Sequence, residues 1–491
     1  MYEAASPLVS MLKDRSKGAA LLVIMLPVLL VTIDNTILTF ALPRIAAALG
    51  PSAAAQLWMI DAYSLVLAGL LVTMGGCGDR FGHRRLLFIG CGGFAVVSLL
   101  LALSQQDWQL IAGRALLGVF GAMILPATLA LIRGAFEDRE ERRVAVAVWA
   151  TCLTLGSALG PLLGGVLLQF FDWPSVFLVA LPFLLPVLLL APSIAETERE
   201  RGAAVDVASI LLSLAAMTCL MLGLKQAATQ GLDAQSVLCL LAGGAWGLSF
   251  VRRQLQLEQP LLDLRLFRRR AFSVSILVNL VSLGLLIGFI FFATQLLQLV
   301  FGLSPMAACL ILVPGQVLAI IAGMGIVPVA QRVGPNLLIT GCLLVAAGAF
   351  AVMALVEASV VSLGIAFLMV NTSVAAITTV SNDLVLSSVP AHKAGSASSV
   401  SETAYEVGVV LGTTLIGGAV AAVYRLSLVV PEGMSEAVAT LGGAHATGGE
   451  ALVQAVNGAF REGVSVTSGA VAGLVVVFAL LTLRGLRGVR S

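Results

Sequence analysis

An apolar run extends from Gly18 to Leu42, and Asp34 is the single charged residue within it. A run of this length spans the hydrocarbon core of a bilayer as one helix. A charged side chain near the middle of such a helix costs at least about 2.5 to 3.5 kcal/mol on insertion. A partner cation, a water-filled cavity or a bound proton must offset this cost. Asp34 is therefore a candidate functional residue.

The composition supports a membrane protein. Hydrophobic residues make up 59% of the 491 residues and charged residues only 11%, whereas soluble domains carry about 25% charged residues. The lipid bilayer is therefore the expected surrounding. The basic residues are not pooled in one segment, so no nucleic-acid partner is expected. The cysteines lie within or at the ends of apolar runs, without metal or disulfide spacing, and we expect them to pack as small apolar side chains.

Apolar runs of membrane length recur along the whole chain. Each run predicts one transmembrane helix. The predicted spans cover residues 19–42, 55–77, 86–104, 109–132, 144–169, 174–192, 205–224, 235–251, 272–299, 304–328, 336–356, 360–384, 396–423 and 465–484. The fold class predicted from them is an all-α integral membrane protein with fourteen helices.

The Lys and Arg residues predict the orientation of these spans. Of the 28 basic residues, 23 lie in segments on the same side as the N-terminus, 4 lie on the other side, and Arg114 lies inside a span. This bias follows the positive-inside rule. No small-residue cleavage site follows a short apolar region, so the first helix is expected to be retained. Both termini are predicted to be cytoplasmic, and residues 424–464 then form a long loop on the opposite side. That loop is either a cap or a passive connector.

A glycine-rich, charged segment joins the second and third spans. Residues 75–85 read GGCGDRFGHRR. The segment resembles the cytoplasmic loop signature of the major facilitator superfamily, with a cysteine where leucine is usual. Glycine permits a sharp turn and close helix approach, and an acid beside basic residues can form ion pairs that break between conformational states. We therefore assign conformational gating to Asp79, Arg80, Gly82 and Arg84. The alternative is an ordinary basic loop.

A degenerate copy of this segment follows the tenth span, where residues 331–334 read QRVG. The echo predicts two related halves, as in transporters built from parallel repeats. Helices seven and eight would then be inserted between the halves. The predicted domains are an N-terminal six-helix bundle at 1–192, the inserted helices with a basic cytoplasmic linker at 193–271, and a C-terminal six-helix bundle with the long outer loop at 272–491.

The fifth span carries a run of small residues around a proline, with Gly156, Gly160, Pro161 and Gly164 in helical register. Small residues four apart form a flat face for close packing, and proline kinks the helix. The run resembles the antiporter motif of drug efflux members of the superfamily. We assign these four residues to conformational gating, although packing alone would also explain them. The thirteenth span contains a weaker echo of this pattern.

The first two spans contain DNTI at residues 34–37 and LWMIDAYSL at residues 57–65. Both segments resemble the fourteen-helix drug:proton antiporters, above all the quaternary-ammonium efflux pumps. The resemblance implies two six-helix bundles plus two inserted helices. It also implies export of lipophilic cationic small molecules and quaternary ammonium biocides against protons, with the proton gradient in place of any cofactor. A monomer in the bacterial cytoplasmic (inner) membrane is expected.

Three charged residues, Asp34, Asp61 and Arg114, are predicted to lie at similar depth in the membrane. Burial favours the neutral form of an acid, whereas a nearby arginine favours the carboxylate. In the resembled family, the acid of the first helix and the arginine of the fourth couple transport to protons. The resemblance therefore assigns proton coupling to Asp34 and Arg114. A permanent structural pair is the alternative, and Asp61 is either a substrate-binding or an interfacial residue.

Two acids of the thirteenth span, Glu402 and Glu406, lie one turn apart on one helix face with Tyr405 beside them. Such acids attract a cation, and aromatic rings add cation–π contacts of about 0.5 to 2 kcal/mol. The predicted substrate-binding residues are these three with Asp61, Tyr63 and Phe292, although the phenylalanine would alternatively face lipid. Residues 314–328 contain no charge, which argues against a preference for divalent cations.

Other functions remain open at this point. The same machinery would suit another small solute, such as an amino acid, a siderophore or a lipid-like molecule. An integral-membrane enzyme is disfavoured because the sequence lacks a recognisable nucleophile–base pair or histidine cluster. A channel is disfavoured by the two-half organisation. No Walker A sequence is present, so ATP is not the expected energy source.

Overall fold

The computed structural model describes residues 14–136, 138–190, 206–257, 264–389, 394–428 and 450–487, with the single residues 260, 262, 441 and 445. All regular secondary structure in these residues is helical. Twelve helices are long and apolar enough to cross a membrane, a bent pair within α6 adds a further span, and a shorter apolar helix covers Ser175–Leu190. These segments match the fourteen predicted spans in order.

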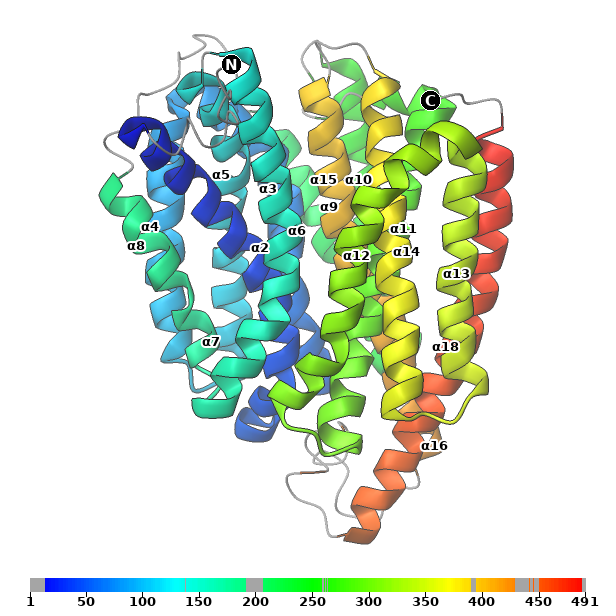
Figure 1. Cartoon of the computed structure of the whole chain (residues 1–491). Helices are drawn as coiled ribbons and strands as arrows, with labels where there is room; N and C mark the ends of the chain where they lie inside the picture. The colour runs from blue at the N-terminus through cyan, green and yellow to red at the C-terminus, as the bar shows by residue number, and fades with distance from the viewer. Residues whose placement is uncertain are drawn as a thin grey trace, which may run out of the picture.

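Figure 1 shows the helices in chain order, from α2 near the N-terminus to α18 near the C-terminus. Their bounds are α2 (Arg15–Leu49), α3 (Ala53–Phe81), α4 (His83–Ala102), α5 (Asp107–Ala135), α6 (Arg139–Phe170), α7 (Ser175–Leu178), α8 (Ala180–Leu190), α9 (Val207–Gln230), α10 (Ala234–Gln256), the 3-10 helix η2 (Leu264–Arg268), α11 (Arg270–Gln295), the π-helix η3 (Leu296–Val300), α12 (Pro305–Val333), α13 (Pro335–Leu355), α14 (Val360–Ser387), α15 (Ala394–Gly412), the π-helix η5 (Thr413–Gly417), α16 (Gly418–Ser427) and α18 (Glu450–Gly485).

The last helix, α18, is longer than predicted. It has 36 residues, and at a rise of about 1.5 Å per residue it is about 54 Å long, against about 30 Å for the bilayer core. Its first turns project beyond the other helices (Figure 1). The predicted loop 424–464 is therefore wrong at both ends, because α16 continues to Ser427 and α18 begins at Glu450. The apolar signal of the sequence marked only residues 465–484, because residues 450–464 include Glu450, Arg461 and Glu462.

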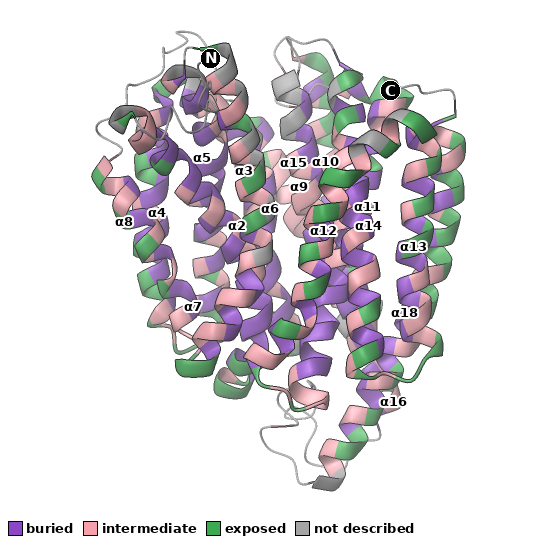
Figure 2. Cartoon of the chain, in the orientation of Figure 1, coloured by how far each residue is buried: buried purple, intermediate pink, exposed green. Residues whose placement is uncertain are grey.

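The helices form two groups that lie side by side, one made of α2 to α8 and the other of α11 to α18 (Figure 1). We call them the N-bundle and the C-bundle. Both marked chain ends lie at the same end of the molecule, and we call the opposite end the distal end. Buried residues line α2 and α5, whereas exposed residues gather on outer surfaces such as those of α4 and α13 (Figure 2). The domain limits drawn from the sequence stay predictions.

The inserted helices α9 and α10 pack against each other, and few of their residues are fully buried. Only 22% of the residues in the apolar stretch of α9 are buried, and 11% of those in the apolar stretch of α10. The corresponding share for α2 is 67%. Leu65 of α3, Met221 of α9 and Val410 of α15 form a small apolar cluster. Through this cluster α9 contacts both bundles. The remaining surface of both helices is suited to contact with lipid.

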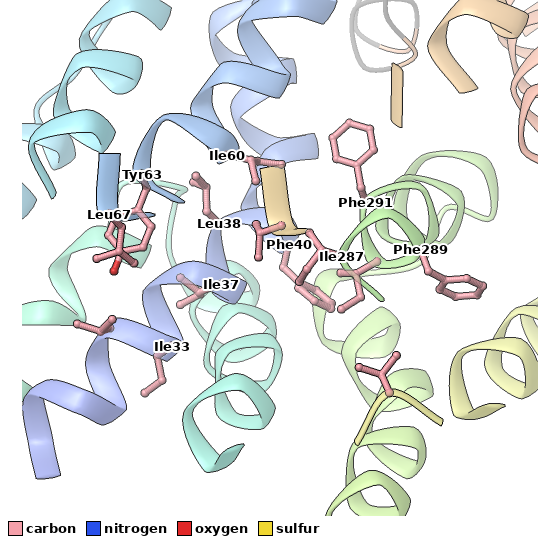
Figure 3. Close-up of a cluster of buried hydrophobic side chains, with 14 of the residues drawn as sticks. Ile33, Ile37, Leu38, Phe40, Ile60, Tyr63, Leu67, Ile287, Phe289 and Phe291 are labelled. Atoms are coloured by element: carbon pink, nitrogen blue, oxygen red, sulfur yellow. The ribbon is translucent and has the colours of Figure 1, made fainter. Parts of the chain in front are cut away.

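The two bundles meet through contacts near the distal end. Gln298 Nε2 of η3 donates a hydrogen bond of 3.1 Å to the Phe40 carbonyl of α2. A Cβ placed on Gly165 of α6 would lie 3.0 Å from Cys309 Cβ of α12. Leu38 and Phe40 of the N-bundle also approach Ile287 of the C-bundle in a buried apolar cluster (Figure 3). The structure is thus closed at its distal end.

Two glycines make the same turn in the two bundles. Gly82 joins α3 to α4 with φ 102° and ψ 129°, and Gly334 joins α12 to α13 with φ 82° and ψ 142°. Positive φ values of this kind favour glycine because it lacks a Cβ. The shared conformation agrees with the internal echo that the sequence showed at residues 331–334. It supports a common helix–turn–helix unit in both bundles.

Candidate translocation site

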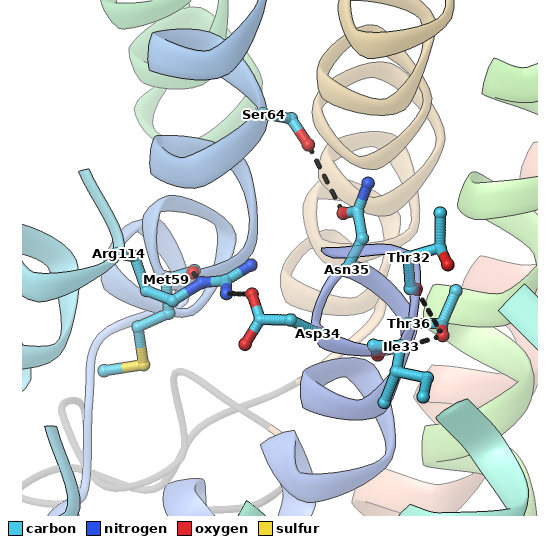
Figure 4. A network of polar contacts seen from close by, with 8 residues as sticks. All are labelled: Thr32, Ile33, Asp34, Asn35, Thr36, Met59, Ser64 and Arg114. Carbon is cyan, nitrogen blue, oxygen red and sulfur yellow. Dashed lines mark hydrogen bonds and ion pairs between the residues drawn. The ribbon is translucent and has the colours of Figure 1, made fainter. Parts of the chain in front are cut away.

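A buried ion pair links α2 and α5 inside the N-bundle. Arg114 Nη1 of α5 donates to Asp34 Oδ2 of α2 (Figure 4). The Arg114 side chain is fully buried and that of Asp34 is only 7% exposed. Such a pair is costly to bury and costs more still when one partner is removed. The sequence placed these residues at similar depth, and the structure brings them into contact.

Arg114 has further partners that fix its position. Its Nε donates a hydrogen bond of 3.2 Å to the Met59 carbonyl of α3, and its guanidinium carbon lies 4.5 Å from the centroid of the Tyr63 ring. Within the described residues, Arg114 Nη2 and the Tyr63 hydroxyl have no hydrogen-bond partner. Buried polar groups normally have partners. The two atoms therefore mark a place for water, a proton carrier or a bound molecule.

The glycine face of α6 packs directly on the helix that carries Asp34. A Cβ on Gly156 would lie 1.8 Å from Thr32 Oγ1, and a Cβ on Gly160 would lie 1.9 Å from Thr36 Oγ1. Both threonine hydroxyls donate to carbonyls of their own helix. Gly164 likewise faces Ile37 across the same contact. The motif therefore holds α2 at close range, and a side chain at these glycines would displace it.

Pro161 lies beside a change of direction in α6. The segments Val144–Ser157 and Leu159–Phe170 meet at 41°. A proline has no N–H and its ring clashes with the carbonyl four residues earlier, which here belongs to Ser157. The kink that the sequence predicted is thus present. Beyond the kink, Gly164 faces α2 and Gly165 faces α12, so this part of α6 lies between the two bundles.

One acid of α15, Glu406, faces the N-bundle. The Glu406 side chain interacts with Ser64 of α3 and Asn35 of α2, and Arg114 and Glu402 are among its electrostatic neighbours. Ser64 Oγ in turn donates to Asn35 Oδ1 at 3.3 Å (Figure 4). Glu406 Oε2 has no hydrogen-bond partner among the described residues. The structure therefore brings the predicted coupling pair and a predicted substrate acid into one polar region between the bundles.

A polar network in the C-bundle supports this region and was missed by the sequence analysis. Asn279 Nδ2 of α11 donates to Ser401 Oγ at 2.9 Å and to Asn382 Oδ1 of α14 at 3.2 Å. Ser401 Oγ donates to Asn382 Oδ1 at 2.9 Å. Tyr405 also interacts with Asn382 and Ser401. The signal was available, since two asparagines inside apolar spans are costly to bury unless they are hydrogen-bonded.

Asp61 lies in a second polar centre, in the half of α3 nearer the distal end and at the same level as Met59 and Tyr63, which contact Arg114. Its Oδ2 is 2.9 Å from Lys225 Nζ of α9, its Oδ1 accepts a hydrogen bond from Thr413, and Thr414 Oγ1 donates to its Oδ2 at 3.2 Å. Both charged side chains are buried, at 0% and 2% exposure. Because the seventh predicted span ends at residue 224, Lys225 was expected just beyond it, on the outer side. The structure corrects this, because α9 continues to Gln230.

Phe292 lies away from these polar centres. It is fully buried in the C-bundle, with its ring centroid 4.8 Å from that of Phe289 and 6.5 Å from that of Phe350. This aromatic cluster packs the core, so Phe292 does not contact the acids as the sequence analysis expected. Nor does it face lipid. Tyr63, in contrast, lies against Arg114.

The residues assigned to the gating loop lie at the end opposite the distal end. Gly82 provides the turn described above, Arg80 is exposed with its guanidinium 5.3 Å from the Phe81 ring, and Arg84 is half-buried. The side chain of Asp79 lies outside the described part of the structure. A Cβ on Gly78 would lie 2.2 Å from His83 Nδ1, so the two helices meet tightly at this turn. The gating role stays a prediction.

Comparison with known proteins identifies the family. Residues 24–413 match the family model of the Major Facilitator Superfamily. The chain is 46% identical to the multidrug efflux pump LfrA of Mycolicibacterium smegmatis over 94% of each chain. It is 33% identical to the methyl viologen resistance protein SmvA of Salmonella typhimurium over 94% of this chain and 96% of that protein.

The fold agrees with this assignment. A bacterial homologue of the human lysosomal transporter Spinster, solved in an inward-facing and unoccupied conformation, superposes with a TM-score of 0.67 at 17% identity. The alignment covers 97% of this chain and 99% of that one. The family consists of transporters rather than enzymes, as the sequence led us to expect. The chain belongs to the Major Facilitator Superfamily.

Proposed function

We propose that this protein exports lipophilic cations, including quaternary ammonium biocides, in exchange for protons across the bacterial cytoplasmic membrane. The observation that carries the proposal is the buried Asp34–Arg114 pair with Glu406 facing it from the other bundle. One basic side chain thus lies between two acids. The relatives are named for multidrug efflux and methyl viologen resistance, which supports a drug as the solute.

Arg114 is the counter-charge that couples the two acids in this proposal. When Asp34 is ionised, Arg114 pairs with it and leaves Glu406 free to attract an organic cation. When a proton neutralises Asp34, the ion pair is lost, and the Arg114 guanidinium instead interacts with the Glu406 carboxylate. A cation bound there is then displaced. Proton and drug thus exclude each other, as exchange requires.

Glu402 and Tyr405 complete the cation site in the proposal. The second acid lies one helical turn from Glu406, and Tyr405 offers a ring face for a cation–π contact. The polar network of Asn279, Asn382 and Ser401 holds this part of α15 in place. Asp61 already has Lys225 as its partner. It is therefore not part of the cation site at Glu406.

Alternating access in the proposal is the parting of the bundles at one end and then at the other. The positive-inside bias puts both termini in the cytoplasm. The closed distal end then faces outward, so the structure corresponds to an inward-open or occluded state. The glycine contact between α6 and α2 and the charged turn at Gly82 are the proposed rigid elements of this motion.

Reconstituted transport tests the proposal. Purified protein in liposomes is given an imposed pH gradient, and efflux of ethidium or a quaternary ammonium dye is followed for the wild type, Asp34→Asn and Asp383→Asn. Asp383 is exposed on α14 and is the matched control. We expect gradient-driven efflux in the wild type and the control but at least tenfold slower efflux in Asp34→Asn. Full activity of Asp34→Asn would refute the coupling role, and an inactive wild type would point to another solute.

A further inference from the structure

Lys225 is held in a cage whose components are those that recognise organic cations. Its Nζ lies 2.9 Å from Asp61 Oδ2 and 3.8 Å from the centroid of the Trp58 ring. Thr413 and Thr414 donate hydrogen bonds to the same carboxylate. An acid combined with the face of a tryptophan is a good binding site for an ammonium group. In this structure the ammonium group belongs to the protein itself.

Three separate parts of the fold supply this cage. Trp58 and Asp61 come from α3 of the N-bundle, Thr413 and Thr414 come from the π-helix η5 of the C-bundle, and Lys225 comes from the inserted helix α9. The π-helix supplies both threonines from adjacent positions, and such segments often occur at functional sites. Because the cage lies where the bundles meet towards the closed distal end, parting the bundles there withdraws η5 from Asp61.

Anchoring of α9 does not require this ion pair. The apolar cluster of Leu65, Met221 and Val410 already ties α9 to both bundles. Replacing a buried ion pair with well-packed apolar residues is often neutral or stabilising. Burying the pair therefore costs more free energy than attachment of α9 requires, given that only 22% of the residues in its apolar stretch are fully buried. A role beyond attachment is the better explanation.

We propose that Trp58 and Asp61 form an exit-side cation site, and that Lys225 is a tethered competitor that empties it. The inference rests on the proposed function, since it requires a cationic solute moving towards the distal end. When that end opens, the exported cation takes the carboxylate and the ring. When it closes, η5 returns and the Lys225 ammonium displaces the cation. A tethered group competes at a high effective concentration, on the order of millimolar.

This arrangement assigns a purpose to the inserted helix. Lys225 prevents rebinding from outside, because in the closed state the site already holds a cation of its own. It is a positioning residue for release, and it pairs with Asp61 rather than with Asp34. Its removal is expected to change how tightly the exit site holds a cation, whereas it leaves proton-dependent binding at Glu406 in place.

The test uses tetraphenylphosphonium and Trp58 fluorescence in purified full-length protein. The variants are Lys225→Met, the double variant Lys225→Met/Asp61→Asn, and the charge-retaining control Lys225→Arg. Each is paired with Trp58→Phe so that the Trp58 signal is obtained by difference. We expect Trp58-dependent quenching in Lys225→Met at concentrations at least tenfold lower than in the wild type. We expect Lys225→Arg to resemble the wild type and the double variant to show no such quenching.

A stability measurement covers the case in which Lys225→Met folds poorly, because it leaves Asp61 buried without its cation. Tetraphenylphosphonium is then expected to raise the thermal stability of Lys225→Met and not that of the double variant. Absence of both the quenching and this rescue would overturn the inference, as would equal effects in the double variant. Efflux by the wild type in liposomes is scored separately, so a failure of the proposed function is distinguishable from a failure of the exit site.

Discussion

Gly160 of α6 and Thr36 of α2 are in such close contact that a Cβ on the glycine would lie 1.9 Å from the threonine Oγ1 and 3.0 Å from the Ile33 carbonyl. The helices cannot keep this spacing with any larger residue. Thr36 is also the second residue after Asp34 along α2. The antiporter-like motif therefore determines how α2 presents its buried acid to Arg114.

Gly160→Ala is expected to destabilise the protein by about 1 to 3 kcal/mol, because overpacking forces the backbone to move. Gly244→Ala in α10 is the matched control, since a Cβ there meets nothing within 4 Å. The control should be neutral or stabilised by up to about 1 kcal/mol, as alanine favours helix. Thermal unfolding of both variants in detergent checks this. Equal stability of the two variants would contradict the proposed packing constraint.

Glu406→Gln is expected to lower cation efflux more than Glu402→Gln does, because Glu406 is the acid that interacts with Ser64 and Asn35 and faces Arg114. We expect at least a tenfold loss for Glu406→Gln and a smaller loss for Glu402→Gln. Initial efflux rates at a fixed pH gradient measure both, with exposed Glu357→Gln as control. If both single variants kept wild-type rates, the cation site would have to lie elsewhere.

Closure of the distal end can be trapped by one added cysteine. A Cβ at position 165 would lie 3.0 Å from Cys309 Cβ, close to the range of about 3.5 to 4.5 Å found in disulfides. Oxidised Gly165→Cys is expected to lose at least nine-tenths of its transport, and reduction is expected to restore it. Gly165→Ser has the same size and cannot cross-link, so it separates steric from covalent effects. Undiminished transport by the cross-linked protein would exclude an opening at this contact.

The pair of inserted helices is clamped at its other end by Asp206 and Arg253. Arg253 donates two hydrogen bonds, of 3.0 Å and 2.8 Å, to the Asp206 carboxylate. These bonds hold the pKa of Asp206, which precedes α9, at about 2. The ordinary value for an aspartate is about 3.9. The ionised form is therefore favoured in the folded protein, and the associated stability is fully present above pH ~4.

Asp206→Asn is expected to lower the stability by about 1 kcal/mol or less, since solvent screens a partly exposed pair. The difference from the wild type should shrink as pH falls from about 4 towards 2, because the wild-type carboxylate becomes protonated there. Thermal unfolding between pH 6 and pH 2 measures this, with Arg252→Gln as an exposed control. A difference that stays constant over this range would show that the clamp does not depend on charge.

The arrangement of the spans was predictable because bilayer thickness imposes a length that apolar runs reveal. The contact between Asp34 and Arg114 was also predictable, since a charge in lipid requires a partner at equal depth. The turn at Gly334 was predictable because residues 331–334 resemble residues 79–82, which form the turn at Gly82. In each case a short sequence pattern reflected a physical requirement, namely the span length, the pairing of a buried charge or the backbone conformation of a turn.

Other features depend on tertiary packing that no local pattern records. Lys225 was placed in a loop because hydropathy falls near the end of its span, although Asp61 and Trp58 make its burial favourable. Phe292 lies in an aromatic core. Its position could not be predicted, because the sequence of an apolar helix does not indicate which face meets lipid and which meets neighbouring helices. The length of α18 escaped prediction because its first turns carry charged residues such as Arg461 and Glu462, which interrupt the apolar run.

The projecting part of α18 has a practical consequence. It is anchored by the Arg461 guanidinium, 5.4 Å from the Phe301 ring, and by Phe460, whose ring centroid is 6.2 Å from that of Tyr424. A detergent micelle or nanodisc hides most of a protein such as this one. The anchored outer turns of α18 offer an ordered epitope for an antibody fragment, and hence a fiducial for imaging the protein in each of its conformations.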